Sequence, residues 1–118
     1  MRTMLTALAT ALVFSGMALA QAPDFSKVEI AAQDLGNKTF MLTGQGGNIT
    51  VAVGDDGILM VDTQFAPLHD KIKAAVAKLS PLPIKFAAIT HYHGDHSGGI
   101  GPFAKDGVTV IAHNNVKK

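Results

Sequence analysis

The spacing of hydrophobic residues indicates strands in the first half of the chain. Short apolar segments alternate with turn residues, a pattern typical of β-structure. The predicted strands cover Val28–Gln33, Thr39–Thr43, Ile49–Val53 and Ile58–Asp62. The last two are separated by Gly54-Asp55-Asp56-Gly57, and Asp-Gly between β-rich segments is a strong turn signal. These two segments are therefore predicted to form a hairpin.

The period changes from two to about 3.6 residues after Pro67. An amphipathic helix is predicted there, with one apolar face formed by Leu68, Ile72, Ala75, Val76 and Leu79. Pro67 suits the start of this helix, and the Ser80-Pro81-Leu82-Pro83 segment ends it. A largely apolar strand over 84–90, buried on both faces, should follow, then a short helix within 98–105 and a strand within 108–113. This order predicts an α/β fold with a mixed sheet.

The N-terminus has the composition of a secretory signal peptide. Arg2 precedes an apolar segment that ends in Ala18-Leu19-Ala20, a small-x-small cleavage pattern. We therefore expect a signal peptide over 1–20, an exposed lead-in over 21–27, a domain over 28–118, and a secreted or periplasmic protein. The alternative is a permanent membrane anchor, for which the apolar segment is close to the lower length limit.

Charge and cysteine content narrow the function classes. The full chain carries 10 Lys+Arg and 9 Asp+Glu, so loss of Arg2 with the signal peptide would leave no net charge. Such a chain has no basic field for nucleic acid or anionic lipid, and no stable membrane association is expected after cleavage. Because there is no cysteine, neither a disulfide nor a thiolate metal ligand is available.

The segment Ile89–Gly99, "ITHYHGDHSGG", concentrates metal-ligand side chains in one loop. Alternate residues of an extended backbone point to the same side, so His91 and His93 can approach one metal ion. A turn at the following glycine would direct Asp95 and His96 elsewhere, where they could hold a second ion. Imidazole and carboxylate ligands without sulfur suit Zn²⁺, and also Fe or Mn.

A simpler interpretation exists for each histidine. The cluster could be a histidine-rich surface loop without metal. Single histidines are usually solvated, and we expect this of His69, on or near the polar side of its helix, and of His113 at a strand end.

The motif His-x-His-x-Asp-His, "HYHGDH" at 91–96, resembles the signature of the metallo-β-lactamase superfamily. The segments "GGNITVAVGDDGILMVDTQ" and "VTVIAHNNV" are also similar to parts of that family's domain. The resemblance implies an αβ/βα sandwich, of which this chain would hold the first half. It implies His91 and His93 as ligands of the first metal and Asp95 and His96 as ligands of the second. Asp62 would be a carboxylate that steadies the metal loop.

The resemblance further implies a metallo-hydrolase with two Zn²⁺ ions per complete domain, Fe or Mn being possible alternatives. A metal-bound hydroxide would attack the carbonyl of a small-molecule substrate, a β-lactam, lactone or other ester-like compound. Asp95 would be catalytic, orienting this nucleophile and accepting its proton. The family takes three further ligands from its second half, so the 118-residue chain alone is expected to be an inactive fragment.

Other interpretations remain open at this point. An iron-dependent oxidoreductase of the sulfur dioxygenase type shares the fold, and a periplasmic metal-binding polypeptide without turnover would share the motif. The segment Gly44–Asn48 resembles the family's mobile loop over the site, or is a flexible hairpin connection. The final residues "HNNVKK" suit either the start of an interrupted helix, with Asn114 or Asn115 as its N-cap, or a frayed polar tail.

Overall fold

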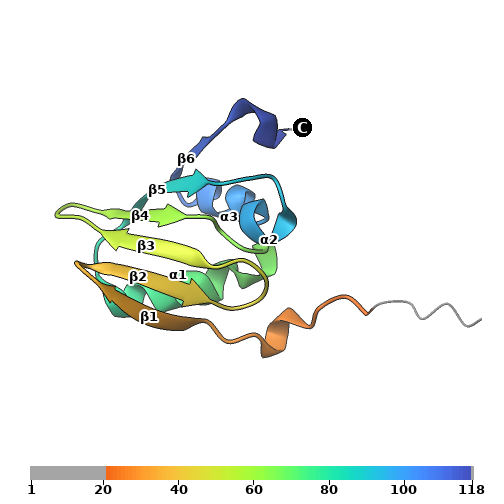
Figure 1. Cartoon of the computed structure of the whole chain (residues 1–118), viewed down its shortest axis with the longest axis horizontal. Coiled ribbons are helices and arrows are strands. Elements are labelled where there is room, and N and C mark those ends of the chain that lie inside the picture. Colours follow the sequence, from red (N-terminus) through yellow and green to blue (C-terminus); the bar gives the residue numbers. More distant parts are fainter. Residues whose placement is uncertain (1–20, 118) are drawn as a thin grey trace, which may run out of the picture.

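A six-stranded mixed sheet forms the centre of the structure, a computed structural model that describes residues 21–117 (Figure 1). The predicted signal peptide lies outside the described residues. The strand order follows the chain, and the first four strands pair antiparallel while β4, β5 and β6 pair parallel. The strands are β1 (Ala31–Gly36), β2 (Thr39–Thr43), β3 (Ile49–Val53), β4 (Ile58–Val61), β5 (Ile84–Ile89) and β6 (Thr109–Ala112). The predicted mixed α/β fold is thereby confirmed.

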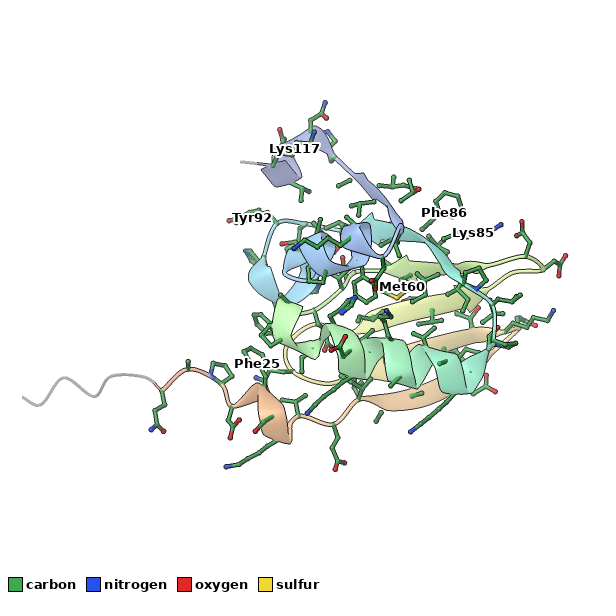
Figure 2. All side chains as sticks on the ribbon, turned by 180° about the vertical axis from the view of Figure 1, so that it is seen from behind. Phe25, Met60, Lys85, Phe86, Tyr92 and Lys117 are labelled. Atoms are coloured by element: carbon green, nitrogen blue, oxygen red, sulfur yellow. The ribbon has the colours of Figure 1, made fainter. Side chains whose placement is uncertain are left out.

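The helices connect the parallel strands and cover one face of the sheet (Figure 2). They are α1 (His69–Leu79), α2 (Gly94–Ser97) and α3 (Ile100–Lys105), with 3₁₀ turns at Phe25–Lys27, Ala66–Leu68 and Asn114–Lys117. The predicted helix after Pro67 is present, and its first apolar residue, Leu68, lies in the preceding 3₁₀ turn. No helix of the described part of the chain is long and apolar enough to cross a membrane.

One core lies between the sheet and the helices, with Met60 at its centre (Figure 2). Alternate residues of β2, β3 and β4 point into it, as the period of two requires. The helices contribute Ile72 and Val76 from α1 and Phe103 from α3, all buried. The strands contribute the fully buried side chains of Leu42, Ile49, Val51, Ile58, Met60 and Ala87. Each large apolar side chain buried in this way stabilises the fold by about 1.5–3 kcal/mol.

The opposite face of the sheet is apolar and open at β4, β5 and β6. Leu59 pairs with Phe86, and Ala88 pairs with Ile111, so these side chains share one face. Leu59 is 38% exposed, Phe86 42% and Ile111 53%. The prediction that the strand over 84–90 is buried on both faces is therefore wrong for this chain, because the helices cover only one side.

The first strand begins later than predicted, at Ala31 rather than Val28. The ammonium group of Lys71 on α1 donates to the backbone oxygens of Phe25, Ser26 and Val28, at 3.0, 2.7 and 2.6 Å. The chain before β1 is thus bound to the helix and not to a neighbouring strand.

His69 is not the solvated side chain that its position suggested. Its Nε2 lies 2.7 Å from Oδ2 of Asp106, its Nδ1 lies 3.0 Å from Oδ1 of Asp70, and only 14% of its side chain is exposed. The ring packs edge-on against Phe103 at 4.6 Å between centroids. His69 therefore links α1 to the end of α3, a contact between residues 37 apart in sequence.

This link predicts a pH-dependent contribution to stability. The pKa of Asp106 is lowered, chiefly by the hydrogen bond from Lys73 and then by that from His69. A depressed carboxyl pKa contributes stability above the unfolded value, about 4, and this contribution is lost as the pH falls through the folded pKa. We expect Asp106→Asn to lower the free energy of unfolding at about pH 6, and the deficit relative to wild type to shrink towards pH 3. Urea unfolding at both pH values measures this, and a pH-independent deficit would contradict it.

Candidate metal centre

The histidine loop lies at the carboxyl end of the parallel strands. Asp62 directly follows β4, and Thr90 directly follows the neighbouring β5. Because adjacent parallel strands end at the same edge of a sheet, residues 28 apart in sequence are brought into contact there. The site therefore depends on the β4–α1–β5 crossover.

Asp62 accepts several hydrogen bonds at this edge of the sheet. Its carboxylate accepts from the backbone N–H of Thr90 at 2.8 Å and from the Thr90 hydroxyl at 2.8 and 3.0 Å. It also lies 2.7 Å from Nδ1 of His96 and is only 4% exposed. Its φ of 68° is left-handed, which is uncommon outside glycine but tolerated by aspartate, and it ends β4 one residue before the predicted end. The buried carboxylate thus connects both ends of the histidine loop.

The contact with Asp62 determines which nitrogen of His96 is free. A carboxylate only accepts, so Nδ1 of His96 donates to it and Nε2 keeps its lone pair. Nε2 of His96 lies 3.5 Å from Oδ2 of Asp95. Two donors about 2.1 Å from one tetrahedral zinc ion are roughly 3.4 Å apart, so this pair has the separation of two ligands of one ion.

The His91 ring lies beside that of His96, and the His93 ring lies beside that of His91. The His91 ring centroid is 4.1 Å from that of His96 and 4.7 Å from that of His93. Nδ1 of His91 is 2.9 Å from the Thr90 hydroxyl. Tyr92 is exposed on the outer side of the loop (Figure 2). The structure therefore gathers the predicted histidines in one group, while their roles as metal ligands remain predictions.

Backbone contacts hold the short helix α2, which carries Asp95 and His96. The Thr63 hydroxyl and backbone N–H both donate to the His96 carbonyl oxygen, at 2.9 and 2.8 Å. Gly99 packs so closely on Thr63 that a Cβ at position 99 would lie 2.6 Å from the Thr63 carbonyl oxygen. This explains why a glycine follows the motif at that position.

Three residues that position the loop escaped the sequence analysis: Thr63, Gln64 and Thr90. Thr63 and Gln64 are completely buried, and Thr90 supplies two of the donors to Asp62. A run of polar residues directly after an apolar strand was the available signal for the first two. Their partners lie 17–36 residues away in sequence, so only the folded chain reveals them.

The predicted donors are of the chemical type that the implied metals prefer. Neutral imidazole and carboxylate oxygen suit Zn²⁺, Fe and Mn. Within residues 21–117, however, no group of three or more such side chains is arranged to hold one ion. Of the four predicted donors, Asp95 and His96 lie 3.5 Å apart, and the ring centroids of His91 and His93 lie 4.7 Å apart. His113 is not one of these four, and its Nδ1 accepts from the backbone N–H of Asn115 at 3.2 Å.

A mixed sheet with a braced His-x-His-x-Asp-His loop at its carboxyl edge defines the class of metallo-β-lactamase-fold proteins. The chain belongs to the metallo-beta-lactamase superfamily, whose family model matches residues 42–118. No curated protein matches the chain significantly.

Solved structures show the same fold. The metallo-beta-lactamase FIM-1 from Pseudomonas aeruginosa, in its mono-zinc form, is similar with a TM-score of 0.68 and 20% identity, over 75% of this chain and 44% of that one. The metallo-beta-lactamase from Erythrobacter litoralis, with beta-mercaptoethanol in its active site, has a TM-score of 0.66 and 24% identity, over 73% and 42%. That from Hirschia baltica has a TM-score of 0.67 and 24% identity, over 73% and 44%. The chain therefore matches less than half the length of each of these structures.

Proposed function

We propose that this chain forms the metal-loop half of a metal-dependent hydrolase that acts on a small molecule with a reactive carbonyl. The observation that supports this most strongly is that three imidazoles and Asp95 lie close together, and that one of these imidazoles, His96, is held by the buried carboxylate of Asp62. A histidine-rich loop without a metal role would not need a buried acceptor that selects the tautomer of one imidazole.

In this proposal His91 and His93 hold one ion, and Asp95 and His96 hold a second. When bound, the ions would make water nucleophilic near neutral pH and stabilise negative charge on a carbonyl oxygen. Asp95 also orients the attacking water and accepts its proton. All three histidines ligate only when neutral, so metal binding should weaken in acid. Zn²⁺ is the ion we favour, because imidazole and carboxylate suit it and because the similar FIM-1 structure is a mono-zinc form.

The proposed complete site needs donors beyond the four described here. Catalytic zinc usually has three protein ligands and water, and two donors are present for each ion. The similar solved structures are more than twice as long as their matched part, and the open apolar face formed by Leu59, Phe86 and Ile111 would suit a second sheet. We therefore propose that the remaining ligands belong to a second half of the domain.

The similar structures support a substrate class, and the N-terminal sequence supports a location. The three similar structures are metallo-beta-lactamases, which supports a β-lactam, lactone or other ester-like substrate. The signal-like N-terminus supports a secreted or periplasmic protein, and the lack of net charge after cleavage supports a protein without a nucleic-acid partner or a stable membrane association. An alternative, a metal-binding polypeptide without turnover, is favoured by the lack, within residues 21–117, of any group of three or more side chains that could hold one ion.

One experiment tests the proposal directly. The full-length gene product, reconstituted with zinc or with iron, should hydrolyse at least one of a chromogenic β-lactam, a lactone or a thioester. Asp95→Ala should abolish turnover, and Asp34→Ala, which changes an exposed carboxylate on β1, should not. Metal binding without hydrolysis would favour the non-catalytic alternative, and oxygen consumption by an iron form would favour a sulfur dioxygenase-type oxidoreductase.

A further inference from the structure

The glycine-rich loop Gly44–Gly47, between β2 and β3, lies directly against the second pair of donors. A Cβ at Gly46 would be 2.5 Å from Cβ of Asp95, and one at Gly47 would be 2.5 Å from Nε2 of His96. Real side-chain carbons do not approach so closely, so positions 46 and 47 can lie here only without side chains. Gly46 also has a left-handed φ of 79°.

Gln64 connects this loop to the metal-loop segment. Its side chain is completely buried, and its Nε2 donates to the Gly47 carbonyl oxygen at 2.6 Å. Its own backbone oxygen accepts from the N–H of Gly99 at 2.9 Å, three residues after the last histidine of the motif. Gln64 therefore links the Gly44–Gly47 loop to the backbone of Gly99.

The side-chain amide of Gln64 is held in one orientation, which leaves one of its polar atoms unpaired. Only its NH₂ end can donate to the Gly47 carbonyl, so Oε1 must point the other way. There Oε1 is buried without a hydrogen-bond partner and faces Gly44, where a Cβ would lie 2.7 Å from it. A buried acceptor without a donor is unfavourable, and an apolar residue would avoid it. The backbone of Gln64 is also left-handed, with φ at 51°.

We propose that Gln64 is a positioning residue that locks the Gly44–Gly47 loop as a fixed wall over Asp95 and His96. Access to the centre is then from the opposite side, where His93 and Tyr92 are exposed while Asp95 and His96 are half-buried. The effect on metal binding rests on the proposed function, in which Asp95 and His96 hold an ion. The fixing of the loop by Gln64 does not depend on a metal. The loop is accordingly not a freely moving flap.

The test uses Gln64→Met in the full-length gene product. Methionine nearly conserves the volume, removes the donor to Gly47 and removes the unpaired acceptor, so the fold should be retained. Without metal, hydrogen exchange of the amides over 45–49 should accelerate about 10-fold or more, while exchange in β4 and β5 stays unchanged. With zinc, the second ion should bind about 10-fold more weakly, as expected when a supporting contact is lost.

Two glycine variants complete the experiment. Gly47→Ala should release the loop with Gln64 intact, because the new methyl group meets the His96 ring. Gly101→Ala is the matched control, since a Cβ there meets nothing within 4 Å, and it should leave both readouts unchanged. Wild-type exchange over 45–49 in both Gln64→Met and Gly47→Ala would overturn the lock. Accelerated exchange in a protein that binds no metal would leave the lock standing and refute the proposed function.

Discussion

Asp62→Ala is expected to lower the free energy of unfolding by about 3–5 kcal/mol, because it removes the buried, charged acceptor of several hydrogen bonds. The carboxylate accepts from the backbone and hydroxyl of Thr90 and from His96, and almost none of it is exposed. A methyl group replaces none of these contacts. Since single domains are stable by about 5–15 kcal/mol, the variant should approach unfolding. Urea denaturation measures the loss.

The matched control for this prediction is Asp55→Ala. Asp55 lies in the exposed turn between β3 and β4 and makes only a 3.9 Å ion pair with Lys38. Its removal should change the free energy of unfolding by no more than about 0.5 kcal/mol. Equal losses in the two variants would show that the acceptor role of Asp62 is unimportant for stability.

Asp62→Asn is expected to weaken binding of the second metal ion by about 10–100-fold. Asparagine keeps one oxygen for the Thr90 backbone but presents an NH₂ group at the other position. If that group faces Nδ1 of His96, the ring must accept there and carry its proton on Nε2. The nitrogen 3.5 Å from Asp95 would then lose the lone pair with which it ligates.

Competition titration of the full-length gene product with a zinc chelator measures this effect. Affinity for the ion held by His91 and His93 should change less, because neither ring contacts Asp62 in the structure. Thr90→Val, which removes a hydroxyl donor to the same carboxylate but not the contact with His96, separates loop support from tautomer selection. If Asp62→Asn and wild type release zinc alike, the tautomer argument fails.

Features encoded by neighbouring residues could be predicted from the sequence. The strands over Thr39–Thr43 and Ile49–Val53 agree with their predicted bounds, because alternation and an Asp-Gly turn are local signals. The helix after Pro67 follows from a period of 3.6 residues over its apolar face. The candidate donors were equally visible, since all four lie within six residues of one another.

The tertiary structure decided the features that join distant residues. The contact between Asp62 and His96 spans 34 positions, that between Gln64 and Gly47 spans 17, and that between His69 and Asp106 spans 37. Each depends on the register of adjacent strands and on how the crossover helix packs, neither of which a local pattern specifies.

What the sequence determined by itself was therefore the chemistry: which side chains could hold a metal and on which kind of element they lie. Folding decided the rest. The β4–α1–β5 crossover places a buried carboxylate beneath one imidazole, the glycine loop between β2 and β3 lies against the same ring, and the helices leave one sheet face open. The physical reason is that ligand type belongs to single residues, whereas tautomer, access and burial arise only when segments far apart in the chain pack together.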